Sequence, residues 1–163
     1  MAFDVFMQID GVQGESTDEK HINWIGIYSY SHGLSQTGSG SVSTHGTRTT
    51  GKVDHQDFHI TKRIDKCSPN LFIHCCNGKH FPKVLFEICV NTGQKEVIEK
   101  YTLEHVLISS LTCSGGDGQD FPVEQVSLQY GKIKWEYFPM SAKDGKKGGA
   151  CVAEWDLMTN KGG

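Results

Sequence analysis

Apolar and polar residues alternate along much of this chain, and this two-residue period constrains the fold more than any other feature. Near the start, every second residue is apolar: Phe3, Val5, Met7 and Ile9. Because side chains of a strand point alternately to opposite faces, the pattern predicts a strand with one buried face. The same period recurs in residues 54–65 and again in residues 84–90. The chain is therefore predicted to be mostly β-sheet.

Between these strands the sequence predicts one further strand and a single helix. Residues 24–32 are rich in aromatic and β-branched side chains, as strands prefer, whereas residues 10–23 are polar and form a connecting loop. Ser68 is the expected helix cap, Pro69 suits the first helical turn, and Gly78 suits a left-handed stop. A short helix is therefore expected over residues 69–77.

The second half of the chain predicts a hairpin followed by a strand that bends. Residues 91–94 form the expected hairpin turn, which leads into a strand over residues 97–112. In residues 123–138 the apolar positions shift from even to odd numbers at Gly131-Lys132, as a bulge at a barrel corner would require. A strand over residues 152–157 then closes the sheet. The predicted fold is all-β, a small β-barrel of about seven or eight strands with one short α-helix, in a single domain of residues 1–163.

Composition excludes several classes of protein. The 163 residues are 37% hydrophobic with a formal net charge of -3, which is globular and gives no broad positive field. Binding to nucleic acid or to an anionic membrane surface is therefore not expected. The first residues, Met1 to Phe6, lack the basic and apolar regions of a signal peptide, and no stretch approaches the roughly 18 apolar residues of a membrane span. Synthesis and folding are expected in the cytosol.

The chain has an even number of cysteines, which could suggest disulfides in a secreted domain. They are Cys67, Cys75, Cys76, Cys89, Cys113 and Cys151. No two of them form a Cys-x-x-Cys motif, and no signal peptide precedes them, so we expect reduced thiols rather than disulfides or a zinc site.

The sharpest catalytic candidate is a metal site at His55, Asp57 and His59, because alternate residues of a strand share one face. Metal ligands need neighbouring groups to orient them, and an exposed strand face provides none. We therefore interpret His55, Asp57 and His59 as a solvated face opposite Phe58 and Ile60. The Gly-x-Ser-x-Gly nucleophile motif and the phosphate-binding glycine motifs are absent. No cofactor and no enzymatic activity are expected.

Residues 36–52 are the one long segment with a biased composition. They consist mostly of Gly, Ser and Thr, with a few charged or longer polar residues and Val42 as the apolar exception. Such a segment cannot bury a face of its own. A long structureless loop within a compact domain is commonly either functional or disordered.

Ordered pieces of sequence across the whole chain resemble one family, the haemolysin-coregulated protein (Hcp) family. The pieces are Met1-Ala2-Phe3-Asp4, Val12-Gln13-Gly14-Glu15-Ser16 with Asp18 and Lys20-His21, Tyr28-Ser29-Tyr30-Ser31-His32-Gly33, Asp65-Lys66 with Ser68-Pro69-Asn70-Leu71, Leu107-Ile108-Ser109-Ser110, and Gly148-Gly149 before Trp155. The resemblance implies a small β-barrel with one helix, the architecture that the alternation also predicts.

The resemblance further implies a tube subunit of bacterial type VI secretion. Six copies would form a ring, and stacked rings would form a tube that is ejected with sheath, spike and effector proteins as partners. The chain would be cytoplasmic before firing and then secreted without a cleaved signal peptide. It would also act as a chaperone for effectors in the bore.

Two surfaces of such a ring can be assigned to residues. Ser29 and Ser31 share a strand face and are expected to line the lumen. Ring stacking is assigned to the long loop, through Ser39, Ser41, Thr44, His45, Thr47, Arg48 and Thr49. Two alternatives remain open: a metal-dependent hydrolase using His55, Asp57 and His59, and a monomeric β-barrel binding module.

Overall fold

The computed structural model describes residues 3–39, 49–141 and 143–163. One helix and fourteen strands are assigned among them. In chain order they are β1 Phe3–Ile9, β2 Ile25–Ile27, β3 Ser29–Ser31, β4 Leu34–Ser35, β5 Gly38–Ser39, β6 Thr49–Thr50, β7 Asp54–His55, β8 Phe58–Arg63, α1 Ser68–Asn77, β9 Phe81–Asn91, β10 Lys95–Ser114, β11 Val123–Gln129, β12 Lys132–Tyr137, β13 Cys151–Asp156 and β14 Lys161–Gly162.

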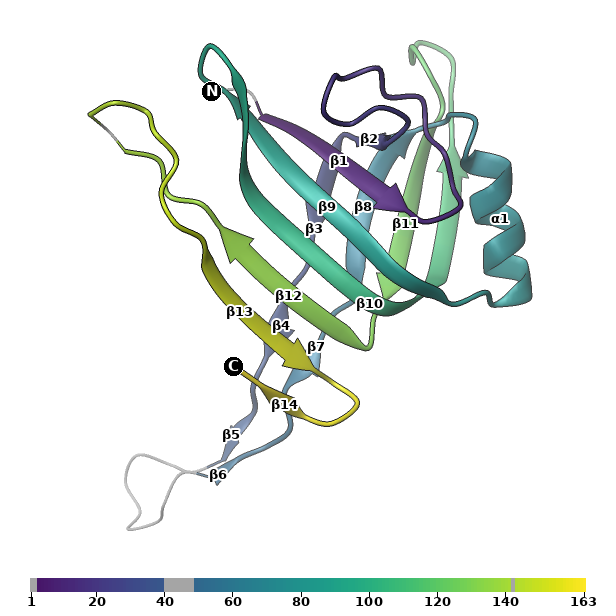
Figure 1. Ribbon diagram of the computed structural model, residues 1–163. Coiled ribbons are helices and arrows are strands. Elements are labelled where there is room, and N and C mark those ends of the chain that lie inside the picture. The colour runs from purple at the N-terminus through teal and green to yellow at the C-terminus, as the bar shows by residue number, and fades with distance from the viewer. Residues whose placement is uncertain (1–2, 40–48, 142) are drawn as a thin grey trace.

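The main sheet curls into a barrel-like circuit (Figure 1). Its hydrogen-bonded order is β14-β13-β12-β10-β11-β8-β3, and β9 joins β10 to β1, which pairs with β2. β2 and β3 are consecutive parts of one extended stretch, interrupted at Tyr28, whose amide donates to the Thr61 carbonyl at 2.8 Å. This stretch passes from one side of the sheet to the other and completes the circuit. The all-β barrel with one helix is therefore confirmed.

β10 is the strand that both halves of the sheet share. Its first part pairs with β9 and β12, and its last part pairs with β11. β11 and β12 lie along the same edge of β10 and are divided at Gly131, whose amide donates to the Glu104 carbonyl at 2.9 Å. Opposite this break, His105 has a positive φ of 54°. The predicted bend at Gly131-Lys132 is confirmed, and it carries the strand from one part of the sheet to the other.

The core fills the inside of this circuit with apolar side chains from most of the long strands. Phe58 and Phe86 lie at its centre, stacked with ring centroids 4.3 Å apart. Among the most completely buried apolar side chains are Met7, Ile9, Ile25, Ile60, Leu71, Phe81, Leu103, Leu128 and Ile133. Stacked aromatic pairs of this kind stabilise a core by about 0.5 to 1.5 kcal/mol beyond the area they bury.

A buried ion pair interrupts this apolar interior. Lys62 and Glu124 are paired across β8 and β11, both side chains are fully buried, and Lys62 Nζ donates to Glu124 Oε2 at 2.7 Å. Burial alone would lower the pKa of Lys62, but the hydrogen bond to Glu124 and the nearby Asp65 hold it above its usual value. Alternation from Phe58 and Ile60 predicts that positions 62 and 64 both point inward. Lys62 does so, but Ile64 lies past the end of β8 and is exposed.

The same cluster fixes the start of the helix. Lys62 Nζ also donates to Asp65 Oδ1 at 3.1 Å and to Ser68 Oγ at 3.3 Å. Ser68 was the predicted cap, but the cap position is Cys67, whose amide donates to Asp65 Oδ1, while the Ser68 hydroxyl accepts from the Asp65 amide. Ser68 does not take the cap position because its hydroxyl accepts a hydrogen bond from the buried Lys62 ammonium. Gly78 ends the helix in the left-handed conformation, as predicted.

The loop of residues 10–23 is held against β9 by a histidine. His21 is buried, stacks on Phe6 with ring centroids 4.2 Å apart, and places its two ring nitrogens 2.7 Å from Asp18 Oδ2 and 2.6 Å from Glu87 Oε2. Lys95 adds an ion pair to Asp18 at 2.8 Å. The hydrogen bonds from Lys95 and His21 lower the pKa of Asp18 to about 2.

Three other predictions need correction. The structure has more strands than the seven or eight predicted. Bent strands are divided, as at Tyr28 and Gly131, and short paired strands lie within residues 34–39 and 49–55. The odd-numbered apolar positions after Gly131 predict that Tyr137 points inward, but it is exposed near the end of the paired segment of β12. β13 does not close the sheet, since β14 lies beyond it as the edge strand. Within the ranges described, no helix is both long and apolar enough to cross a membrane.

Candidate assembly surfaces

Ser29 and Ser31 both point away from the core, as the sequence predicted. β3 pairs with β8, with Ser29 opposite Thr61 and Ser31 opposite His59, and both serines are exposed. Between them Tyr30 points inward, where its ring stacks on Phe58 and its hydroxyl donates to Glu99 at 3.3 Å. The two faces of this strand are therefore assigned by packing, with the tyrosine held inside and the serines left outside.

Tyr28 breaks the predicted face. Strict alternation from Ser29 and Ser31 predicts that Tyr28 points inward with Tyr30 and His32. Tyr28 is instead 60% exposed, because the chain bends between β2 and β3 and the inward positions change from odd to even numbers there. Ile27 points inward before the bend and Tyr30 after it. His32 does point inward, where it stacks on Phe58 at 5.1 Å.

The serines begin two rows of polar side chains that cross the sheet from β3 through β8 and β11 to β10. We call them the polar rows. Cross-strand register defines the first as Ser29, Thr61, Gln125 and Thr112, and the second as Ser31, His59, Ser127 and Ser110. None of the eight carries a carboxylate, an ammonium or a guanidinium group. The rows form an outer sheet face of hydroxyls, one amide and one imidazole.

Local hydrogen bonds hold part of the second row. His59 Nδ1 lies 2.8 Å from Ser127 Oγ, and Ser127 is nearly buried beneath its neighbours. Beside them, the Ser109 hydroxyl lies 3.1 Å from the Ser127 carbonyl and 2.6 Å from Asp57 Oδ2. The other six members of the rows were not assigned to the lumen from the sequence. For the four on β8 and β11, the alternation opposite the apolar residues of these strands carried the signal.

The candidate metal site does not assemble. Gln56 and Asp57 separate β7 from β8, so His55, Asp57 and His59 do not share one continuous strand face. His55 Nδ1 lies 3.0 Å from the Tyr130 hydroxyl, whereas Asp57 and His59 contact Ser109 and Ser127. Across the described ranges no group of three His, Cys, Asp or Glu side chains could hold a metal ion. All six cysteines are free thiols, and burial raises the pKa of Cys89 to about 11.

The segment predicted to be a structureless loop is an arm of paired strands. β4 pairs with β7, and β5 pairs with β6, so residues 34–39 and 49–55 leave the barrel as paired segments that project downward in Figure 1. Of the predicted stacking residues, Ser39 and Thr49 are opposite one another in the β5–β6 ladder. The others, Ser41, Thr44, His45, Thr47 and Arg48, lie outside the described residues.

The root of this arm rests on aromatic side chains. His32 precedes it and contacts Phe58 and Tyr101, and His55 ends it beside Tyr130 and Trp135. Burial lowers the pKa of both histidines. The negative charges of Glu99 near His32 and of Asp54 near His55 raise it in part. We call this arrangement, with both histidines packed against aromatic rings, the closed root. It favours the neutral form of each imidazole.

Fold and surfaces together define a class of protein: a small all-β barrel with one helix, a polar outer sheet face and a projecting β-arm. Comparison with known proteins identifies the family within that class. Residues 6–137 match the family described as "Type VI secretion system effector, Hcp". The chain belongs to this Hcp family.

Individual relatives agree along the whole chain. It is 38% identical to protein hcp1 of Pseudomonas aeruginosa, with 98% of each chain covered. Among solved structures, a type six secretion system protein superposes with a TM-score of 0.93 at 36% identity, covering 99% of this chain and all of that one. Hcp1 from Salmonella typhimurium gives a TM-score of 0.80 at 31% identity, with 99% of each chain covered. The family favours a structural role in type VI secretion over a metal-dependent hydrolase or a monomeric binding module.

Proposed function

We propose that this chain is a tube subunit of type VI secretion, which forms rings of six copies that stack into a hollow tube with the polar rows lining the bore. The observation that carries the proposal is the composition of these rows. They cross four strands on the face opposite the core and offer hydrogen-bonding groups without fixed charge. Such a wall stays hydrated when empty and holds varied cargo by weak contacts.

The dimensions of a strand-built bore are consistent with that role. Neighbouring strands lie about 4.8 Å apart, so four strands from each of six subunits would give an inner wall roughly 115 Å around and a bore roughly 37 Å across between backbones. Tilted strands would widen it slightly. A bore of this size accepts a small folded domain, which supports transport and chaperoning of effectors in the lumen.

Assembly of this kind needs two kinds of contact. A head-to-tail contact between unlike surfaces closes the ring, and a second pair of surfaces stacks one ring on the next. The arm from Leu34 to His55 is the proposed stacking element, because it extends beyond the barrel and its ladder around Ser39 and Thr49 carries backbone pairing away from the core. Sheath, spike and effector proteins are the further partners proposed for the assembled tube.

The mass of the purified protein in solution tests the proposal. A ring of six predicts a species of about six times the 18.1 kDa subunit mass, and electron micrographs should show rings. A species of one subunit mass at every concentration, with no rings in the images, would contradict it. For export, we propose a cytoplasmic protein that is secreted without cleavage, so the secreted form should retain the amino terminus of the cytoplasmic form when both are weighed intact.

A further inference from the structure

A second projection leaves the barrel between β12 and β13, in residues 138–150, and we call it the basic hairpin. Figure 1 shows it extending from the upper left of the sheet. Its own backbone bonds give it shape: the Ser141 amide donates to the Lys146 carbonyl at 2.9 Å, and the Gly148 amide donates to the Pro139 carbonyl at 2.7 Å. Gly145 adopts a positive φ of 67° at the turn. In residues 138–141 and 143–150, the hairpin therefore presents a defined surface.

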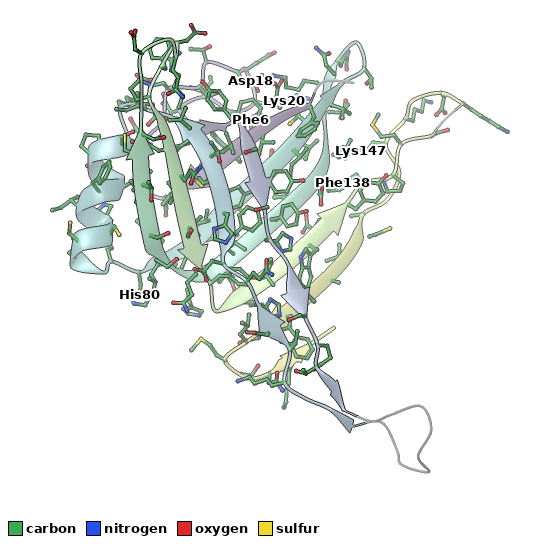
Figure 2. The ribbon with its side chains drawn as sticks, turned by 180° about the vertical axis from the view of Figure 1, so that it is seen from behind. Phe6, Asp18, Lys20, His80, Phe138 and Lys147 are labelled. Carbon is green, nitrogen blue, oxygen red and sulfur yellow. The ribbon has the colours of Figure 1, made fainter. Side chains whose placement is uncertain are left out.

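That surface is positively charged. Lys143, Lys146 and Lys147 lie within five residues and are all exposed, with Asp144 as the acidic residue among them. Lys147 Nζ lies 3.9 Å above the Phe138 ring, and Figure 2 shows the two side chains together on the projection. The lysine–aromatic contact orients one cation, and the other two lysines extend around the turn.

A groove with more carboxylates than cations lies where the start of β1 pairs with the end of β2. It has a volume of about 550 Å³, and its lining carries the carboxylates of Asp4, Glu15 and Asp65 and the guanidinium of Arg63. Two neighbouring lysines offset part of this charge, because Asp4 and Asp18 share Lys95 while Asp65 and Glu124 share Lys62. Carboxylates still outnumber cations around the groove. Two of its aromatic side chains are largely exposed, Phe3 at 55% and Tyr28 at 60%. We call it the acidic groove. It combines negative charge with apolar surface, which suits a lysine-rich hairpin that carries an aromatic residue.

Gly26 keeps the groove open. It lies within β2, opposite Phe6 in the β1–β2 ladder, and lines the groove. A Cβ atom built at this position would meet no atom within 4 Å, and the backbone does not require glycine. Any larger side chain here would therefore occupy space that the chain itself leaves empty. A larger residue at position 26 should therefore fill the groove without disturbing the fold.

We propose that the basic hairpin of one copy docks in the acidic groove of the next copy around the ring. The inference rests on the proposed function and specifies the surfaces of its head-to-tail contact. A projecting element and a recess are unlike surfaces on one chain, as a ring-closing contact requires. Their charges are complementary, and such complementarity steers partners together and fixes their register.

Three variants test the docking, each compared with the wild-type protein by its assembly in solution. The hairpin variant replaces three lysines by glutamate: Lys143→Glu, Lys146→Glu and Lys147→Glu. It should raise the concentration at which rings form by at least about tenfold, because like charges would then meet in the groove. The matched control reverses Lys66, Lys79 and Lys161, which are exposed elsewhere and change the net charge equally. Adding Glu15→Lys to the hairpin variant should recover part of the assembly.

Gly26→Leu probes the other side of the contact. Circular dichroism and thermal unfolding should match the wild type, while ring formation should weaken by a similar factor. Gly116→Leu is the control, because a Cβ atom there also meets nothing within 4 Å. If wild-type rings form and the hairpin and Gly26 variants assemble as well as their controls, the docking inference is overturned and the proposed function stands. If the wild-type protein does not assemble, both are overturned.

Discussion

The barrel and the arm from Leu34 to His55 are built by the same antiparallel pairing, but they differ in what they bury. The barrel encloses a continuous apolar core and even a fully buried Lys62–Glu124 pair. In the arm, the described side chains at Leu34, Ser35 and Gln36 are exposed, and the ladders are only two residues long. The barrel can stabilise itself, whereas the arm gains stability chiefly where it meets the barrel or another molecule.

This difference separates folding from assembly. Isolated two-stranded hairpins are marginally stable in water, so an arm without a core of its own should depend on its aromatic root and on a partner. Substitutions in the barrel interior should therefore reduce folding stability, and changes in the arm or on the polar rows should affect assembly or cargo. The predictions below test that separation, beginning with the largest effect.

Removing one member of the buried ion pair should unfold or severely destabilise the barrel. Lys62→Met leaves Glu124 buried without its cation, and breaking such a pair typically costs about 3 to 5 kcal/mol. Urea unfolding should show the loss, while Lys66→Met, at an exposed lysine four residues away, should change stability by no more than about 0.5 kcal/mol. Equal stability of the two variants would show that the pair does not hold β8 and β11 together.

Shortening the arm should leave the barrel folded and remove stacking. If residues 37–51 are replaced by a two-residue turn, the closure entropy of the shorter loop changes stability by only about 1 to 2 kcal/mol. Single rings should still form, because stacking is the contact proposed for the arm. Tubes of normal length from the shortened protein would place the stacking contact elsewhere.

Acid should loosen the root of the arm before it unfolds the barrel. Burial lowers the pKa of His32 and His55 below the usual 6.5, so the open root binds protons more readily than the closed one. The stability that these neutral histidines contribute is full above pH 6.5 and is lost as the pH falls from 6.5 through their lower pKa in the closed root. The titratable groups near His32 are Glu99, Tyr101 and His55, and those near His55 are Asp54 and Tyr130.

Hydrogen exchange at the root provides the measurement. The Gln56 amide, which donates to the Gly33 carbonyl at 2.9 Å, should lose protection between pH 7.5 and pH 5.5 after correction for intrinsic rates. Amides of β9 in the barrel should keep theirs. Replacing His32 and His55 together by Phe should remove the difference between the two pH values, and a loss of protection that persists in this variant would exclude the histidines as its cause.

The smallest expected effect on stability is that of Ser31→Gln. Ser31 is exposed on the outer face, so the change should alter the free energy of unfolding by only about half a kcal/mol. Ring formation should survive, but six larger side chains at one level of the bore should reduce the amount of effector that co-purifies. Ser35→Gln, at an exposed serine in the arm, is the control. Marked destabilisation would mean that the Ser31 side chain points into the core of the barrel rather than away from it.

Much of the fold was predictable because strand alternation and turn residues act locally. The bend at Gly131 and the left-handed Gly78 follow from such local rules. The full burial of Lys62 could not be predicted, because it depends on Glu124, which lies 62 residues away and is brought opposite it only by sheet pairing. The same long-range pairing explains why Ser68 is not the helix cap.

The candidate surfaces were predictable only in part. Ser29 and Ser31 share a face by alternation alone, but the rows they begin extend to Ser110 and Thr112, which are placed by the register of four strands. A segment of Gly, Ser and Thr has no apolar period, so the paired strands of the arm gave no signal. His55, Asp57 and His59 had the spacing of one strand face, and the break at Gln56 separated them.

The central claim is that the polar rows form the wall of a bore, and a reconstruction of the assembled protein by electron cryomicroscopy tests it most directly. We expect a six-fold ring in which β3, β8, β11 and β10 surround the channel, with Ser31 and its row facing the lumen and the helix α1 away from it. A ring whose polar rows lie on the outer wall, or particles of a single subunit without symmetry, would contradict the account.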